Sequence, residues 1–173
     1  MGKRVAVILL LVAFLWSCGG CADTTPPDYL AFLERAFVAE IRGERNGTAF
    51  SAKISAMPSE DGVTVRIEYL NPDSLGGISV TSVCNADGDL VGDAEVCRGE
   101  TAVRVDSQSL FGLLEPALCW FLLDTHTAVQ KREGGYILQF ADGVLTVMDE
   151  RGLPRSYSSE ELCYDIIWWE ERF

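Results

Sequence analysis

The chain has 173 residues, a formal net charge of −12 and 48% hydrophobic residues. This length suits one domain that buries a sizeable core. The acidity argues against direct binding to nucleic acid phosphates and against attachment to anionic lipid through a basic face.

The N-terminus has the pattern of a secretory signal. Lys3 and Arg4 precede an apolar run, Val5–Trp16. This run matches the apolar region of a signal peptide and is shorter than the roughly 17–25 residues of a membrane-spanning helix. We therefore predict that residues 1–17 form a signal peptide.

The sequence Leu15-Trp16-Ser17-Cys18 resembles a bacterial lipobox, although Trp16 departs from the usual small residue. The resemblance implies that the Cys18 thiol carries diacylglycerol, that cleavage precedes Cys18, and that residues 18–25 form a lipidated tether. The protein would then sit on the outer face of the cell membrane through its acyl anchor. Loss of Lys3 and Arg4 would change the net charge from −12 to −14.

Other interpretations of this segment stay open. It could be an ordinary secretory signal or a retained membrane anchor. Cys18 and Cys21 have CxxC spacing, but no second CxxC follows to complete a metal site.

Five cysteines remain after Cys18, and this odd number argues against a complete disulfide framework. Cys84 and Cys97 flank a turn-rich segment and could pair. Cys119 and Cys163 lie in apolar runs and are expected to be buried.

A short helix is expected at the start of the domain. Thr25 and Pro26 suit a helix start, and apolar residues from Tyr29 to Phe37 follow helical spacing. These signals predict an amphipathic helix of about ten residues.

Period-two alternation begins at Phe37 and predicts about nine antiparallel strands along the rest of the chain. Asn46-Gly47 is a strong hairpin signal because both residues tolerate positive φ. The last strand is expected over Leu162–Glu170. On it, four residues should share one face: Leu162, Tyr164, Ile166 and Trp168.

One long element interrupts the strands. Ser109–Leu123 is apolar nearly all round, and Pro116 should kink it. It is too short to span a bilayer, so we expect a buried helix against the sheet. The predicted fold class is α+β, a strongly curved antiparallel sheet covered by the N-terminal helix and this central helix.

Three segments carry a resemblance to a known family: Ala36–Ile54, Glu68–Val80 and Phe140–Ser158. Their order resembles the lipoprotein-carrier fold of LolA-like and LppX-like proteins, including GerS-like lipoproteins of spore-forming bacteria. The resemblance covers residues 28–173, within a single domain over residues 26–173. It implies a half-barrel whose concave face holds acyl chains under the helices.

The apolar residues of the central helix and the strands have two interpretations, which the sequence leaves open. They either fill the core or line a cavity for lipid acyl chains, and we favour filling. The candidate residues are Leu110, Phe111, Leu114, Leu118, Phe121, Phe50, Ile54, Val65, Ile67, Ile166 and Trp168.

Catalysis is not expected. His126 is the only histidine, in a polar link, and no nucleophile elbow, phosphate loop or zinc-protease motif occurs. Asp87, Asp89 and Asp93 depart from calcium-loop spacing, so we expect neither metal nor cofactor. Trp168-Trp169 should point to opposite faces of a strand, which argues against one sugar-binding platform.

The sequence therefore predicts a non-catalytic envelope lipoprotein that binds lipid or an envelope partner protein. The alternative is a structural or regulatory interaction lipoprotein with a filled core and no lipid ligand. An envelope hydrolase or glycan binder ranks third.

Lipidation at Cys18 has a direct test in intact mass. Protein expressed in a bacterial host should have the mass of residues 18–173 plus diacylglycerol, and Cys18→Ala should abolish this species. A wild-type mass showing cleavage elsewhere without lipid would contradict the anchor.

Overall fold

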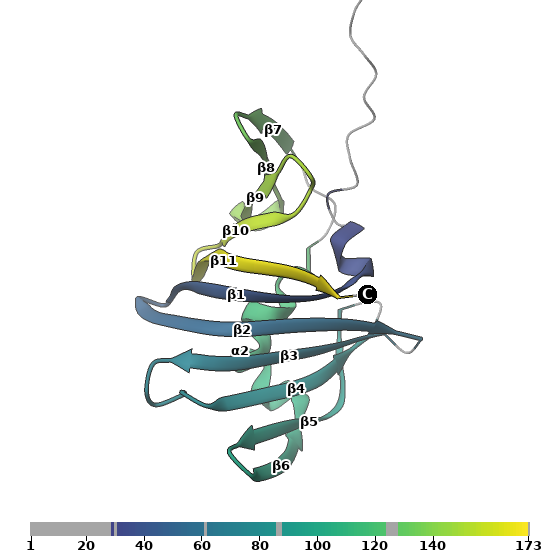
Figure 1. The fold of residues 1–173 in the computed structure, drawn as a ribbon, viewed down its shortest axis with the longest axis vertical. Helices are drawn as coiled ribbons and strands as arrows, with labels where there is room; N and C mark the ends of the chain where they lie inside the picture. The colour runs from purple at the N-terminus through teal and green to yellow at the C-terminus, as the bar shows by residue number, and fades with distance from the viewer. Residues whose placement is uncertain (1–28, 30, 61, 86–87, 124–127, 173) are drawn as a thin grey trace, which may run out of the picture.

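One antiparallel sheet of eleven strands dominates the computed structural model (Figure 1). The structure describes residues 29, 31–60, 62–85, 88–123 and 128–172, so the predicted signal peptide and tether lie outside it. The strands are β1 (Ala36–Arg45), β2 (Thr48–Ser59), β3 (Gly62–Asn71), β4 (Ile78–Cys84), β5 (Leu90–Arg98), β6 (Thr101–Asp106), β7 (Ala128–Arg132), β8 (Gly135–Gln139), β9 (Leu145–Asp149), β10 (Pro154–Ser158) and β11 (Leu162–Arg172). The helical elements are η1 (Ala31–Glu34), η2 (Ser107–Leu110), η3 (Ala141–Gly143) and α2 (Phe111–Leu118), where η marks a 3₁₀ turn.

The strand order follows the chain with a single exception. The order is β6-β5-β4-β3-β2-β1-β11-β10-β9-β8-β7, so β1 lies between β2 and the last strand. The predicted Asn46-Gly47 hairpin is present, with φ of 49° and 76° at its two turn residues. Positive φ at both positions matches the twist of the flanking strands.

One face of the sheet carries the core. Alternate residues of the strands are buried there, and α2 crosses this face behind β1 to β4 (Figure 1). The same cluster contains Leu138 and Met148 from β8 and β9, and Val80 and Ala94 from β4 and β5. The core cluster therefore extends across strands that lie far apart in the sheet order.

The predicted N-terminal helix is not supported. Of its residues, the described part forms the 3₁₀ turn η1, and β1 has already begun at Ala36. Phe37 fits both a helical and an alternating pattern. The strand prevails because β1 pairs along its length with both β2 and β11.

The predicted helix over Ser109–Leu123 is also wrong in its extent. α2 covers only Phe111–Leu118, so the described residues contain one short α-helix. Pro116 lacks an N–H and leaves the carbonyl of Gly112, four residues earlier, without its helical donor. The Arg45 guanidinium donates to this carbonyl instead.

A β-bulge in β11 reverses the expected facing of its end. Ile41 pairs with Ile166 and Glu40 with Trp168, so Ile167 is an extra residue. Trp168 consequently lies on the outer face and is 44% exposed. Trp169 packs inward instead, with its ring stacked 4.3 Å from that of Phe37.

This reversal predicts unequal losses of stability from the two tryptophans. Trp169→Ala should lower the free energy of unfolding by roughly 2–4 kcal/mol because it removes a packed aromatic ring. Trp168→Ala should lower the free energy of unfolding by less than about 1 kcal/mol, because this side chain lies on the outer face and is 44% exposed. Urea unfolding of both variants measures the difference, and equal losses would contradict the bulge.

Candidate functional site

The predicted lining residues divide into a buried majority and two exposed exceptions. Leu114, Leu118, Phe50, Ile54, Val65 and Ile67 are buried in the core. Leu110, Phe121 and Ile166 are half-buried and pack against it. Phe111 is 38% exposed and Trp168 44%, so neither side chain is enclosed in the sheet. Trp168 faces outward because of the bulge.

Trp120, two residues beyond the end of α2, is the largest of the fully buried side chains described. Three aromatic rings pack against it. The ring centroids of Phe32, Tyr157 and Tyr164 lie 5.7, 5.6 and 6.1 Å from it, all in edge-to-face geometry. Such contacts add to the burial energy of each ring, so this cluster holds η1, β10 and β11 against the end of the helix.

A buried polar contact fixes the end of α2 to β11. The Tyr164 hydroxyl donates to the Pro116 carbonyl at 3.1 Å and lies 2.9 Å from the Cys119 sulfur. Burial raises the pKa of Tyr164 well above its ordinary value, and that of Cys119 is raised for the same reason. Both groups therefore stay neutral at physiological pH and act as structural hydrogen-bonding groups.

A second set of polar contacts fixes the start of α2 to β1 and β3. Arg45 forms an ion pair with Glu115 at 2.6 Å and donates to the Gly112 carbonyl. The Tyr69 hydroxyl donates to the Leu113 carbonyl at 2.8 Å. Burial raises the pKa of Tyr69 to about 12, which keeps it protonated. Both ends of the helix are thus attached to the sheet.

The space left beside α2 is small. An apolar cavity of about 130 Å³ lies between Phe50, Tyr69, Leu75 and Leu113. A second, of about 160 Å³, lies between Cys119, Phe140, Val144 and Tyr157. Ligand pockets in proteins usually measure about 300–1,000 Å³, so each cavity is smaller than a typical ligand needs.

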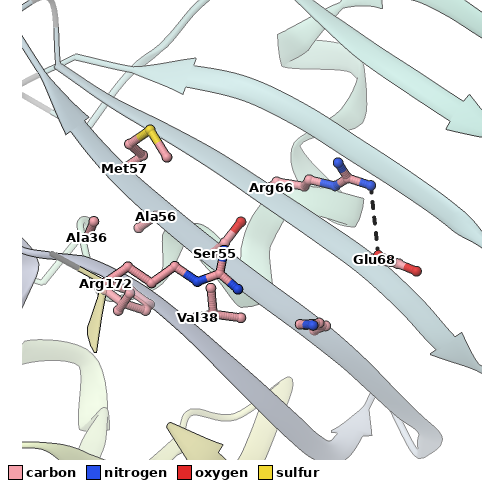
Figure 2. A pocket seen from close by; sticks show the side chains of 10 residues that line it. Ala36, Val38, Ser55, Ala56, Met57, Arg66, Glu68 and Arg172 are labelled. Carbon is pink, nitrogen blue, oxygen red and sulfur yellow. Dashed lines mark ion pairs between the residues drawn. The ribbon is translucent and has the colours of Figure 1, made fainter. Parts of the chain in front are cut away.

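A larger recess of about 280 Å³ lies on the outer face of β1, β2 and β3, and we call it the outer cleft (Figure 2). Its lining includes Lys53, Arg66 and Arg172. Val38 also lines it and is only 5% exposed, although it faces away from the core. The cleft therefore combines an apolar base with three cationic side chains.

Acidic residues border the outer cleft. Arg66 lies 3.8 Å from Glu68 and also donates to Ser79 at 3.3 Å. The strand register places Glu40 opposite Lys53 and Glu170 opposite Val38. This cleft was not predicted from the sequence. The polar alternation of β2 and β3 was visible, but Arg172 joins it only through the pairing of β1 with β11.

Within the described residues, no three histidine, cysteine or carboxylate side chains gather as a metal site would require. No described helix is long and apolar enough to cross a membrane. His126 and Asp87 lie outside the described residues. Asp89 and Asp93, also considered for calcium, are exposed.

The described cysteines are free thiols. The Cys84–Cys97 disulfide left open by the sequence is wrong, because Cys84 pairs with Leu90 in the sheet and Cys97 with Ser79, several residues further along β4. Cys119 is buried as expected, whereas Cys163 is exposed. Cys163 lies on the outward side of β11, so its apolar neighbours in the sequence do not enclose it.

No protein-family model matches the chain. No curated protein matches it either. Solved structures do resemble it. An uncharacterized conserved protein from Thermus thermophilus is 11% identical, with 84% of each chain covered and a TM-score of 0.52.

Two further solved structures are similar to the chain. One is a domain named for outer membrane lipoprotein sorting, from Vibrio parahaemolyticus, at 9% identity, with 80% of this chain and 86% of that chain covered and a TM-score of 0.44. The other is a LolA superfamily protein from Nitrosomonas europaea, at 12% identity, with 79% and 71% covered and a TM-score of 0.33. The predicted resemblance to LolA-like proteins is confirmed, and at these identities it concerns the fold alone.

The burial of the thiols predicts their order of reaction with a water-soluble maleimide. Cys163 should react first and Cys97 more slowly, while Cys84 and Cys119 should react only after unfolding. Burial raises the pKa of Cys84 and of Cys119, which further disfavours the reactive thiolate. Peptide mapping after timed labelling gives the order, and early labelling of Cys119 in folded protein would contradict the packing of α2.

Proposed function

We propose that this chain is a non-catalytic envelope lipoprotein, anchored through Cys18, that binds a partner protein on its outside and carries no lipid inside its sheet. One observation supports this choice over a lipid carrier. Leu114, Leu118 and Trp120 are fully buried between helix and sheet, where a carrier would hold acyl chains. The cavities of about 130 and 160 Å³ beside α2 are separate small spaces.

The attachment of α2 strengthens the argument. Arg45, Tyr69 and Tyr164 each bond a carbonyl of the helix, and these carbonyls belong to three different residues. Moving the helix aside to admit a lipid would leave these groups without partners. Each buried polar group left unpaired costs about 1–3 kcal/mol, which disfavours an open interior.

The outside of the sheet offers sites for a protein. β6 and β7 end the sheet and pair on one side only. β7 carries Lys131 and Arg132, charges that discourage pairing with another strand. β6 also carries charges, Arg104 and Asp106, but it has no lysine or proline, and Val103 on it is 51% exposed. An extended partner segment could add to β6 as a further strand.

The proposal predicts that the purified mature protein holds no non-covalent lipid inside its sheet. Protein delipidated in detergent and re-exposed to zwitterionic phosphatidylcholine should show, in native mass spectrometry, only the covalent diacylglycerol. A variant with an emptied interior, Leu118→Ala with Trp120→Ala, serves as the comparison if it stays folded. One phosphatidylcholine retained per wild-type chain would instead identify a lipid carrier.

A further inference from the structure

The largest recess described here lies at the end of the sheet where the chain enters the domain. It measures about 430 Å³ and we call it the end cleft. Ala31 and Phe32 of η1 and Trp169 and Glu171 of β11 line one side. Arg151, Gly152 and Leu153, from the turn between β9 and β10, line the other.

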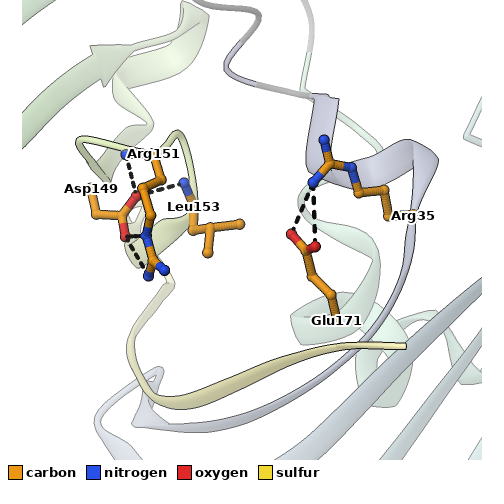
Figure 3. A network of polar contacts seen from close by, with 5 residues as sticks. All are labelled: Arg35, Asp149, Arg151, Leu153 and Glu171. Atoms are coloured by element: carbon orange, nitrogen blue, oxygen red, sulfur yellow. Dashed lines mark hydrogen bonds and ion pairs between the residues drawn. The ribbon is translucent and has the colours of Figure 1, made fainter. Parts of the chain in front are cut away.

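Two arginines stand on opposite sides of this cleft (Figure 3). Arg35 donates to both carboxylate oxygens of Glu171, at 3.1 and 3.3 Å. Arg151 donates to Asp149 at 3.2 and 3.3 Å. The side chains of Arg35 and Arg151 are 58% and 79% exposed, so both remain accessible to a ligand.

These ion pairs do not commit the arginines to a structural role. Exposed pairs contribute about 0–1 kcal/mol, so an arginine exchanges its carboxylate for another anion at small cost. Asp149 also accepts from the backbone N–H groups of Arg151 and Leu153, at 2.8 and 2.9 Å. Burial alone would raise the pKa of Asp149, but these hydrogen bonds lower it and keep the carboxylate charged. The turn therefore holds its shape without the Arg151 guanidinium.

Apolar side chains form part of the lining of the end cleft. Trp169 and Phe32 meet edge to face with ring centroids 5.5 Å apart, and Leu153 also lines the cleft. A ligand that suits these side chains has carbon atoms next to its anionic group. Guanidinium groups bind phosphate through two parallel hydrogen bonds, which favours phosphate as that group.

The position of the end cleft in the domain indicates that membrane lipids are the source of this phosphate. Tyr29, just before η1, lies eleven residues after Cys18. An extended tether of that length spans roughly 36–40 Å, so a lipid on Cys18 keeps this end of the domain near the bilayer. Arg172 lies at the same strand end, on the opposite face of the sheet. Tryptophan is enriched at membrane interfaces, and Trp169 lines the end cleft.

From these observations we infer that the end cleft binds the phosphate of an anionic phospholipid headgroup and orients the domain on its own membrane. This inference rests on the proposed envelope location. It adds a local contact through two arginines on an otherwise acidic domain, while attachment to the membrane stays with the acyl anchor and the interior stays filled.

The test uses short-chain lipids below their micelle concentration, so that membrane insertion of the anchor does not contribute. Full-length mature protein in neutral detergent is titrated calorimetrically with dihexanoyl phosphatidylglycerol, dihexanoyl phosphatidylcholine and inorganic phosphate. The phosphatidylglycerol probe should bind, and the other two should bind at least about tenfold more weakly. Equal affinity for inorganic phosphate would identify a free-phosphate site and overturn the lipid assignment.

Charge-matched variants locate the binding. Arg35→Gln with Arg151→Gln should weaken phosphatidylglycerol at least about tenfold, while Lys131→Gln with Arg132→Gln on β7 should leave it unchanged. Arg35→Lys with Arg151→Lys keeps charge and fold and should bind at an intermediate level. The inference would be overturned if both double glutamine variants weakened phosphatidylglycerol binding equally. It would also be overturned if the wild-type protein did not bind phosphatidylglycerol. A soluble probe reports on the cleft whether or not Cys18 is acylated, so failure here is distinguishable from failure of the proposed function.

Discussion

The structure depends on covering a very large apolar sheet face with very little helix. Most of the eleven strands bury alternate apolar side chains on one face, and α2 has only eight residues to set against them. One core cluster spans the sheet and includes residues of the helix. Large aromatic side chains supply much of the remaining volume, and Trp120 is the largest fully buried side chain described. Since each ring buries a large area, a few of them replace a second helix.

Proline and arginine act together in this arrangement. Pro116 would ordinarily weaken so short a helix, because it removes one of few backbone hydrogen bonds. Here the carbonyl released at Gly112 becomes an acceptor for Arg45, and the carbonyl of Pro116 itself accepts from Tyr164. The helix therefore exchanges internal bonds for bonds to the sheet. The same bonds that stabilise α2 also fix its position.

Most strands were predictable because alternation of apolar and polar residues records which face is buried. The bounds of the central helix were harder to predict. Its segment is apolar on all sides, so no change in the apolar–polar pattern marks where the helix begins or ends. The bulge at Ile167 was not predictable from the sequence. Ile166 to Trp169 are all apolar, so the core-facing positions are apolar whichever alternate residues point inward. Both clefts escaped prediction for a different reason. Each draws on β11 and on elements far from it in sequence, so they exist only once β1 and β11 have paired. The signal peptide and Cys18 remain predictions.

The pairing of the first strand with the last has a consequence for how the chain is made. Synthesis releases a protein from its N-terminus, so β1 and β2 emerge early while β11 comes at the end. Until then, β1 presents an unpaired edge, and the aromatic cluster lacks Tyr164 and Trp169. Contacts between such distant parts of a chain form slowly. A chain that ends before residue 162 lacks β11, so the edge of β1 stays unpaired. Such shortened chains are prone to aggregation or proteolysis, and only the complete chain covers this edge.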